Sequence, residues 1–343
     1  MERPALLILL PTDRPAAGAP SDRPLGCAAL NLEREGITIL LGDQVRGGRI
    51  HAWRATEAGW TQDSAAGVVA VHDRYPAEAR SRTWRELRRS LGDSLFGNPP
   101  DLTTLCKDKL ACQTFLSSLS LGMPEVEGDE ARFEERIATW GSAFLKPRRG
   151  SSGAGIRLLR GPEDLPTPQP PLSGPRQPNT LVRTDWILQR AVDPPPGLAG
   201  LALRVLVQRE VSGNWWIGPA VARRSTSDPV VNAARGAEVL QGDAAVSSDC
   251  LAIAASQSAR VAEALAERPG GDRLVELGLD FVVGSDGLPH LIEVNSAPRG
   301  RLLHLARLHP ARWQQTHQDA VERPLRRLLA LAFDEATPAS GPA

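Results

Sequence analysis

The chain of 343 residues has few cysteines, no excess of charge of either sign and no long apolar run. Its four cysteines lack CxxC spacing and are too few for a disulfide scaffold, so we expect buried thiols and a cytoplasmic location. The 40 basic and 40 acidic residues cancel, which gives no electrostatic case for binding nucleic acid. The apolar run at residues 5–10 is too short to span a membrane and lacks the features of a secretory signal. Six histidines without HxH or HExxH spacing argue against a zinc site.

The first hundred residues have the pattern of a small α/β domain. Short strands are predicted at residues 5–10, 36–41 and 67–72, with one helix near 83–91. The pair Pro99-Pro100 marks a boundary, and Asp101 or Thr103 can cap the helix that follows it. Apolar residues at helical intervals then run from 106 to 121.

The rest of the chain alternates strands with a few helices. A proline-rich stretch at 161–178 is expected to be a surface insertion between two strands. Strands are predicted at 180–192, 201–210 and 215–221, and an amphipathic helix at 256–267. A helix at 317–333, broken or kinked at Pro324, precedes a tail that we expect to be disordered.

The segment from Leu274 to Arg301 carries the most chemical information. It predicts two strands, around 279–283 and 289–294, joined by a turn at 284–287. Glu293 and Asn295 are two apart and therefore face the same side of the sheet, and the hairpin brings Asp280 beside them. Three hard oxygen donors on one face suit Mg²⁺, whereas the plainer interpretation makes them polar residues of an edge strand.

A second motif joins a lysine to a loop of glycine and serine. Lys146 ends a predicted strand, and the loop that follows contains Ser151, Ser152 and Gly153. Successive backbone N–H groups, two hydroxyls and a lysine charge suit the oxygens of a polyphosphate. The glycine spacing fits neither a Walker loop nor a dinucleotide fingerprint. The alternative is a flexible hairpin tip without a ligand.

Two further segments give only weak evidence of a function by themselves. One is Lys107-Asp108-Lys109, near the start of a helix, where surface lysines are the default interpretation. The other is residues 187–193, a strand that enters a proline run and could offer backbone groups to a purine.

Together these motifs resemble the ATP-grasp superfamily, with fold elements like those of D-alanine–D-alanine ligase. The Asp280 hairpin matches the superfamily's Asp followed by Glu-x-Asn-x-x-Pro at Glu293, Asn295 and Pro298. The middle of the chain is similar to the YheC/YheD subfamily, known from endospore coat-associated proteins. The segments that carry this likeness are Arg204 to Gln208, Gly213-Asn214-Trp215, Ala222-Arg223, Val231 to Gly236 and, near the N-terminus, Val71 to Pro76.

The resemblance implies an ATP-grasp fold of class α+β or α/β, in which two α+β subdomains grip ATP after a small N-terminal α/β domain. We expect the N-terminal domain at 1–100, the first subdomain at 101–190, the second at 191–335 and a tail at 336–343. The implied activity is ATP- and Mg²⁺-dependent ligation of a carboxylate to an amine or thiol through an acyl phosphate. The substrate would be an amino acid or peptide. Ligases of this kind are often dimers, although no interface patch can be read in the sequence.

The resemblance also assigns roles to residues. The α- and β-phosphates would contact Lys109 and Lys146, and the loop residues Ser151, Ser152 and Gly153 would close over the β- and γ-phosphates. Adenine would be held by Gln189, Arg190 and Val192, and ribose by Asp193, while Asp280, Glu293 and Asn295 would hold one or two Mg²⁺. Catalytic roles fall to Lys146, to Arg204 at the acyl phosphate, and to Asn232 and Arg235 near the acceptor. Arg299 and Arg301 either bind a substrate carboxylate or are exposed charges.

Several positions depart from the family pattern. Ala202, Val231 and Ala237 stand where an acidic residue, a threonine and a glycine are usual, and Gly278 stands where D-alanine–D-alanine ligase has an arginine. The transition-state cation must then come from elsewhere, with Arg204 or Arg223 as candidates. Two alternatives to a ligase stay open: a coat-associated or scaffold protein that makes no bond, and an ATP-grasp phosphotransferase.

Overall fold

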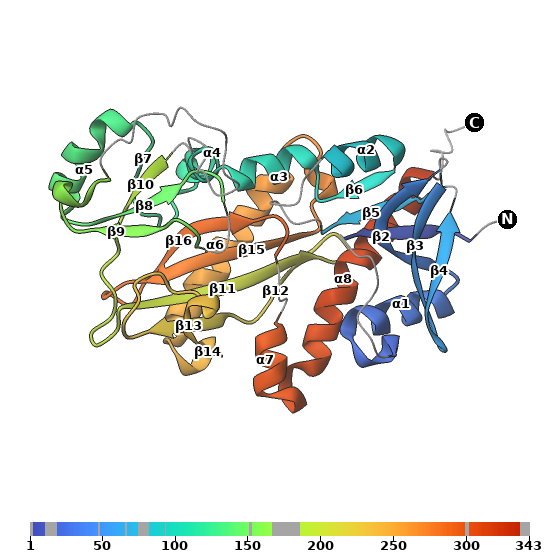
Figure 1. The fold of residues 1–343 in the computed structure, drawn as a ribbon. Helices are drawn as coiled ribbons and strands as arrows, with labels where there is room; N and C mark the ends of the chain where they lie inside the picture. Colours follow the sequence, from blue (N-terminus) through green and yellow to red (C-terminus); the bar gives the residue numbers. More distant parts are fainter. Residues whose placement is uncertain are drawn as a thin grey trace, which may run out of the picture.

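The computed structural model describes residues 3–10, 19–46, 49–65, 67–74, 82–92, 94–150, 153–166, 186–298 and 302–336. Within these ranges the chain forms three β-sheets that follow one another along the sequence, each with its own covering helices (Figure 1). The first sheet lies at the end of the molecule where both termini are found, and the second lies at the opposite end (Figure 1).

The first sheet contains six strands in the order β4-β3-β2-β1-β5-β6. They are β1 (Ala5–Leu9), β2 (Thr38–Arg46), β3 (Arg49–Thr56), β4 (Gly59–Ala65), β5 (Ala70–Asp73) and β6 (Leu95–Gly97). β1 is parallel to β2 and β5, and β5 is parallel to β6, whereas β3 and β4 are antiparallel additions. All five residues of β1 are buried, as expected for a strand at the centre of a parallel sheet with both faces covered.

Helices cover both faces of this sheet. Leu6 and Ile8 of β1 pack with α1 (Pro24–Arg34) and with α8 (Pro310–Ala336), while Leu7 and Leu9 pack with Leu87 of α2 (Arg82–Ser90). The alternation along β1 follows from the two-residue period of a strand. Helix α8 comes from the far end of the sequence, so the core of the N-terminal sheet is completed by the last described residues of the chain.

The second sheet is antiparallel, with the order β7-β10-β8-β9. Its strands are β7 (Val126–Glu127), β8 (Ala143–Pro147), β9 (Arg157–Leu159) and β10 (Trp186–Arg190), and α5 (Phe133–Trp140) packs against it. The expected insertion at 161–178 follows β9. Its first residues form a short 3-10 helix at Pro162–Asp164, and residues 167–178 lie outside the described part of the chain.

The single helix expected at 106–121 is two helices, and that prediction was wrong. α3 (Pro100–Lys107) begins one residue after Pro99, before both proposed caps, and α4 (Lys109–Leu116) follows after a break at Asp108. Asp108 has an extended backbone, and its side chain accepts a hydrogen bond from the Ala111 amide, 3.1 Å away. A buried aspartate that caps a second helix favours a restart over a continuous run.

The third sheet has the order β14-β13-β11-β15-β16, with β12 paired to β11. Its strands are β11 (Gly200–Arg209), β12 (Trp215–Ile217), β13 (Val221–Ser225), β14 (Glu238–Gln241), β15 (Glu276–Val283) and β16 (Pro289–Asn295). The helix α6 (Ser248–Ala266) packs on one face, and α7 (Leu303–Leu308) leads into α8. The predicted hairpin at β15 and β16 is confirmed.

Two helices extend beyond their predicted bounds. α6 begins eight residues before the expected start, because Ser247 caps it by accepting a hydrogen bond from the Cys250 amide. α8 begins at Pro310 and continues through Pro324, so the expected break at that proline does not occur. The described part of the expected tail ends with α8 at Ala336, and residues 337–343 lie outside the described ranges.

A buried polar contact joins the first sheet to the third. The Glu276 carboxylate of β15 accepts hydrogen bonds from Arg74 (3.0 Å) and Gln208 (3.1 Å), and His72 Nε2 lies 3.2 Å from it. Asn98 adds backbone contacts, because its amide nitrogen donates to the carbonyls of Glu276 and Ser296. Burial raises the pKa of Glu276 to about 7 and lowers that of His72 to about 3. Sequence patterns had singled out His72 and Arg74 without a partner for either.

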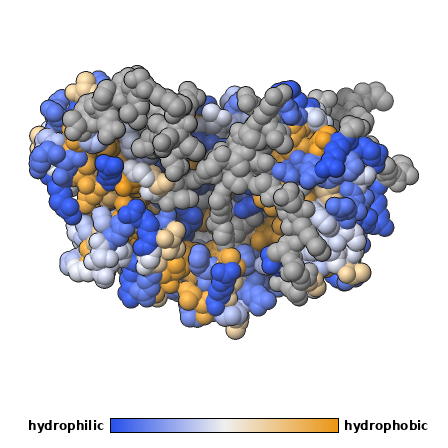
Figure 2. All heavy atoms as spheres, viewed as in Figure 1, coloured by the Kyte–Doolittle hydropathy of each residue, from blue (hydrophilic) through white to orange (hydrophobic). Residues whose placement is uncertain are grey.

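The surface is mostly polar where it is described. Figure 2 shows hydrophilic atoms over much of the visible face and smaller hydrophobic patches between them. The large apolar side chains that are exposed are scattered: Val69, Val211, Leu288, Leu308 and Phe333. Across the described ranges, no helix combines the length and the apolar character that crossing a bilayer requires.

Candidate functional site

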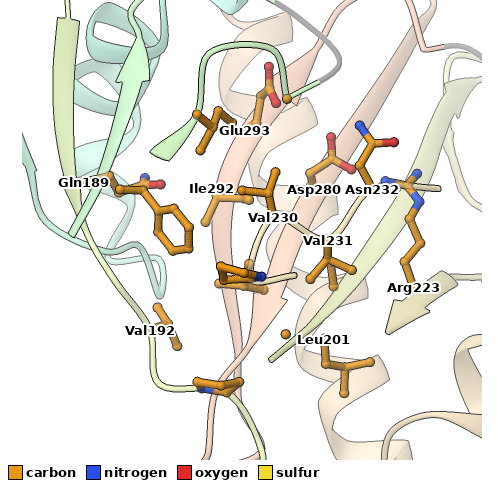
Figure 3. A pocket seen from close by; sticks show the side chains of 18 of the residues that line it. Gln189, Val192, Leu201, Arg223, Val230, Val231, Asn232, Asp280, Ile292 and Glu293 are labelled. Carbon is orange, nitrogen blue, oxygen red and sulfur yellow. The ribbon is translucent and has the colours of Figure 1, made fainter. Parts of the chain in front are cut away.

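A cavity lies between the second and third sheets (Figure 3). It encloses about 990 Å³, a volume that includes space open to solvent. Strands β8 and β10 supply one wall, and strands β11, β13, β15 and β16 supply the other. Both walls carry charged side chains among lining residues that are mostly apolar.

Acidic and amide groups gather on the third sheet, at the paired strands β15 and β16. Asp280 lies directly opposite Glu293 in the strand register, and a bulge follows Asp280. The amide nitrogen of Asn295 donates to Asp280 Oδ2 over 2.8 Å. The three side chains that the hairpin was predicted to bring together therefore lie side by side.

Two lysines face these acidic groups. Lys146 at the end of β8 is buried, and its ammonium group donates a hydrogen bond to the Gln189 carboxamide oxygen. Lys109 at the start of α4 donates to the Gly150 carbonyl over 2.8 Å and lies 3.7 Å from Glu293 Oε1. The Lys109–Glu293 pair thus crosses the cleft from the side of the loop after β8 to the hairpin.

The electrostatics of the site follow from burial and from these neighbours. Burial raises the pKa of Glu293; Lys109 opposes this rise and Asp280 adds to it. Burial lowers the pKa of Lys146 to about 8, against the attraction of Glu293 and with the repulsion of Lys109. Excess negative charge at the carboxylates would be neutralised by a cation, and excess positive charge at the lysines by an anion.

The acidic side of the site fits Mg²⁺. Two carboxylates and one amide offer hard oxygen donors within one small region of the sheet, which is the donor chemistry that Mg²⁺ takes from proteins. The set holds only two carboxylates, and nowhere in the described ranges do three or more His, Cys, Asp or Glu side chains gather at a metal-binding spacing. Such a sparse set suits an ion that keeps waters and shares substrate phosphates.

Two arginines reach the same region from neighbouring strands. Arg204 of β11 is opposite Asp280 and grips it with two hydrogen bonds, Nε to Oδ1 at 2.7 Å and Nη2 to Oδ2 at 2.5 Å. Attraction to Asp280 raises the pKa of Arg204. Arg223 of β13 extends towards Asn232 and Asp280 (Figure 3). Burial and then the charge of Arg204 lower the pKa of Arg223.

The structure explains why no arginine stands at position 278. A Cβ atom on Gly278 would lie 2.9 Å from the Cβ atom of Pro298, so the position has no room for a side chain. Pro298 is held in turn, because its carbonyl accepts a hydrogen bond from Arg74 over 3.0 Å. Positive charge at this face therefore comes from β11 and β13.

The loop after β8 is anchored by Asp108, for which no role was predicted from the sequence. Asp108 accepts hydrogen bonds from Arg148 Nε (2.7 Å) and Arg149 Nη2 (2.8 Å), and the Lys109 amide donates to the Arg148 carbonyl over 3.1 Å. Burial raises the pKa of Asp108, but the hydrogen bonds from Arg148, the Ala111 amide and Arg149 outweigh it and lower the pKa. The only sequence signal was an aspartate between two lysines at a helix start.

The described part of that loop lines the cavity. Gly153 has φ of +73°, a conformation that favours glycine, and a Cβ atom there would lie 3.3 Å from a Val230 methyl group of the opposite wall. The loop thus approaches the third sheet closely. Ser151 and Ser152, which were predicted to cover phosphates, lie outside the described residues.

The residues predicted to hold adenine all line the cavity, whereas the residue predicted for the ribose does not. Gln189, Arg190 and Val192 line the cavity, and Asp193 is not among the lining residues. The Gln189 side chain already contacts two partners, the Lys146 ammonium group and the Gln113 carboxamide oxygen at 3.3 Å. The apolar lining that the sequence analysis missed is supplied by Phe144, Ile156, Leu201, Val230, Val282 and Ile292.

The two residues predicted to lie near an acceptor, Asn232 and Arg235, are placed differently. Asn232 lines the cavity, and its side-chain oxygen accepts a hydrogen bond from the Ala234 amide over 2.9 Å. Arg235 pairs with Asp228 over 2.7 Å and is not among the lining residues. Arg299 and Arg301 lie outside the described residues.

Comparison with known proteins identifies the fold. Residues 181–331 match the model of the YheC/D-like ATP-grasp family. None of the curated proteins matches the sequence. Among solved structures, VanG D-Ala:D-Ser ligase from Enterococcus faecalis is similar, with TM-score 0.60 and 12% identity over 95% of this chain and 99% of that chain. D-alanyl-alanine synthetase A from Vibrio cholerae O1 biovar eltor str. N16961 gives TM-score 0.56 and 12% identity over 96% and 99%.

A third similar structure is the ATP-grasp ligase PsnB complexed with a phosphomimetic variant of a minimal precursor, Mg and ADP. It has TM-score 0.52 and 16% identity over 92% of this chain and 97% of that chain. The chain therefore has the ATP-grasp fold. Its residues 181–331 are similar to the YheC/D-like branch, which confirms the resemblance recognised in the sequence.

Proposed function

We propose that the chain is an ATP- and Mg²⁺-dependent ligase that joins a carboxylate to an amine or thiol through an acyl phosphate. The observation that carries this proposal is the opposition of charges across one cavity. Lys146 lines the cavity opposite Asp280 and Glu293. Outside the lining itself, Lys109 lies 3.7 Å from Glu293, and Asn295 donates a hydrogen bond to Asp280. Phosphoryl transfer depends mainly on positioning and charge neutralisation, and this arrangement supplies both.

The nucleotide would lie with its base among the apolar residues of the cavity and near Gln189, Arg190 and Val192. Lys109 and Lys146 would bind the α- and β-phosphates, and the loop with Ser151, Ser152 and Gly153 would close over the β- and γ-phosphates. Asp280, Glu293 and Asn295 would hold Mg²⁺, which when bound supplies positive charge to the phosphate oxygens. Asp193 remains our proposal for the ribose, although it is not among the lining residues.

In the first step a carboxylate oxygen of the acid attacks the γ-phosphorus, and the bond to ADP breaks. Arg204 is suited to steady the resulting acyl phosphate, because Asp280 fixes two of its guanidinium nitrogens and leaves the third for a ligand. In the second step the acceptor nitrogen or sulfur attacks the acyl carbon, inorganic phosphate leaves and the acceptor loses a proton. Asn232 would lie near that acceptor, and Arg235 remains proposed for the same region.

The test is nucleotide turnover by the whole chain. We expect Mg²⁺-dependent ADP release in a screen of amino acids and short peptides, and a product whose mass equals acid plus acceptor minus water. Absence of ATP binding in calorimetric titration with Mg²⁺ would favour a scaffold without ligation. A phosphorylated product without release of phosphate would favour a phosphotransferase. A cytoplasmic location and a homodimer remain predictions from the sequence.

A further inference from the structure

The hairpin of β15 and β16 ends where the third sheet meets the first. β16 stops at Asn295, and the last pair of the ladder joins Asn295 to Gly278 of β15. Beyond this pair the chain leaves the sheet, so the carbonyl groups of Ser296 and Pro298 lose the partners that a ladder would supply. Both residues are buried, and their carbonyl groups therefore need hydrogen-bond donors from elsewhere in the protein.

Two side chains of the first sheet supply these donors. Asn98, directly after β6, donates from its amide nitrogen to the Ser296 carbonyl over 2.6 Å. Arg74, directly after β5, donates from Nη2 to the Pro298 carbonyl over 3.0 Å. β5 and β6 are parallel neighbours, so the two side chains follow strands that end at the same edge of the sheet. The chain that follows Asn295 is thus held from the N-terminal sheet.

The same two side chains also bind the start of β15. The Asn98 amide nitrogen donates to the Glu276 carbonyl over 2.6 Å, and the Asn98 side-chain oxygen accepts from the Val275 amide over 2.7 Å. Arg74 Nη1 donates to the Glu276 carboxylate over 3.0 Å. Each side chain therefore bridges the start of β15 and the chain after β16, and it joins the two strands beyond the last pair of their ladder.

Packing restrains the same segment. A Cβ atom on Gly278 would lie 2.9 Å from the Cβ atom of Pro298, so Pro298 packs against the β15 backbone at this position. Gly278 is the register partner of Asn295, and the Asn295 amide nitrogen donates to Asp280 Oδ2 over 2.8 Å. A shift of the chain at residues 296–298 would therefore move the Asn295 amide and disturb its contact with Asp280.

We infer that Arg74 and Asn98 are positioning residues for the proposed Mg²⁺ site, an inference that rests on the proposed ligase function. Neither is among the residues that line the cavity, so both act through the hairpin. They hold the chain after Asn295 in the position from which its amide and the Asp280 carboxylate meet the cation. Replacing residues that orient metal ligands typically changes metal affinity by about 10–100-fold. The N-terminal sheet thereby sets the response of the third sheet to Mg²⁺.

The test is the Mg²⁺ dependence of ATP binding by the full chain, measured by calorimetric titration with ATP at a series of free Mg²⁺ concentrations. We expect Arg74→Gln to need about tenfold more Mg²⁺ than the unaltered chain for half of the gain in ATP affinity. Saturating Mg²⁺ should restore the affinity, because the variant weakens binding of the cation and leaves the rest of the cavity intact.

The matched control is Arg323→Gln, which makes the same substitution in the same buried network. Its loss falls on Gln208, to which Arg323 donates over 2.8 Å, while the contacts of Arg74 and Asn98 stay in place. Both arginine variants should lower the melting temperature. Only Arg74→Gln should raise the Mg²⁺ requirement, and Arg323→Gln should need as much Mg²⁺ as the unaltered chain.

A double variant shows whether Arg74 acts through Asn295. Asn295→Ala alone should raise the Mg²⁺ requirement at least about tenfold, and adding Arg74→Gln should raise it no further, because residues that act as one unit are not additive. Asn98→Ala, which leaves the Ser296 carbonyl without its donor, should act in the same direction as Arg74→Gln. If Asn98→Ala does not fold, Arg74→Gln and the double variant still decide.

The outcomes separate this inference from the ligase proposal. If ATP binds and the Mg²⁺ requirement is the same in Arg74→Gln, Arg323→Gln and the unaltered chain, the positioning inference fails and the ligase proposal stands. Equal increases in both arginine variants, or additive effects of Arg74→Gln and Asn295→Ala, would also overturn the inference. If the unaltered chain binds no ATP at any Mg²⁺ concentration, the ligase proposal fails and the inference fails with it.

Discussion

Lys109 and Glu293 meet across the cleft, with 3.7 Å between the ammonium nitrogen and the nearest carboxylate oxygen. The lysine begins α4 beside the glycine loop, and the glutamate lies on β16 of the third sheet. The contact brings together charges of opposite sign from a helix and from the third sheet. A nucleotide bound with a divalent cation would be inserted between these two groups, and each would then contact a part of the ligand.

Removing Glu293 tests the acidic side of the cleft. We expect Glu293→Ala to lower the rate of ADP formation at least ~100-fold, equivalent to about 2.7 kcal/mol of barrier, because a ligand of the cation is lost. Its melting temperature should stay close to that of the unaltered chain. Glu238→Ala, which removes an exposed glutamate from the same sheet, should leave turnover unchanged. Near-normal turnover by Glu293→Ala would remove the metal assignment.

Lys146 should make the affinity for ATP fall at alkaline pH. Its pKa is lowered to about 8, so the cation is present below that pH and is lost as the pH rises through it. ATP affinity should therefore fall above about pH 8. In Lys146→Arg the guanidinium stays protonated, and the affinity should be flat over this range. Titrations with ATP between pH 7 and pH 9.5 check this. If the affinity falls with pH equally in both proteins, a group other than Lys146 is responsible.

Asp108 should support both α4 and the loop after β8, which we propose to cover phosphates. In Asp108→Asn the hydrogen bonds from Arg148 and Arg149 lose a charged acceptor, so we expect the KM for ATP to rise about tenfold. The free energy of unfolding should fall by about 1–3 kcal/mol. Asp129→Asn is the matched control, because Asp129 caps a short helix through the Ala131 amide at an exposed position. An unchanged KM in Asp108→Asn would show that the loop does not need this anchor.

The buried Glu276 makes stability depend on pH in a definite direction. Its folded pKa of about 7 lies above the ordinary value of 4.5, so between these values the unfolded chain loses a proton that the folded chain keeps. Its contribution to stability is therefore complete below pH 4.5 and is lost as the pH rises to 7, by about 3 kcal/mol. His72, with its pKa lowered to about 3, acts in the opposite direction, because its contribution is lost as the pH falls from 6.5 to 3.

The variant Glu276→Gln keeps a hydrogen-bonding side chain and removes the titration. Its stability relative to the unaltered chain should increase by about 3 kcal/mol between pH 4.5 and pH 7. Urea denaturation at these two pH values measures the difference, in which the contributions of other groups cancel. Glu125→Gln, at an exposed surface pair, should show no such change. A constant difference for Glu276→Gln would mean that the carboxylate is already ionised in the folded protein at pH 4.5.

The sequence was most informative where local rules are strict. The turn residues between β15 and β16 and the alternation along both strands were enough to predict the hairpin and the meeting of Asp280, Glu293 and Asn295. A two-residue spacing puts side chains on one face whatever surrounds them. The fold followed from the same motifs through their resemblance to a superfamily.

Contacts between segments far apart in the sequence could not be predicted. The grip of Asp108 on Arg148 depends on two segments forty residues apart, and the partners of Glu276 come from three separate regions of the chain. Glu276 reads as an ordinary strand residue, since nothing in its neighbours in the sequence shows that it is buried. The restart at Asp108 was missed for a related reason: apolar spacing continues across the break, and only the backbone shows two helices.

Helix α8 has a consequence for how the protein is made. Leu325 and Leu328 pack with Leu6 and Ile8, so one face of β1 shares its core with a helix made more than three hundred residues later. Until α8 has been made, α1 alone covers this face, and the part that α8 would cover is exposed to water and to other nascent chains. We therefore expect early chain termination before residue 310 to yield an aggregating product, in place of a shorter protein with an intact N-terminal half.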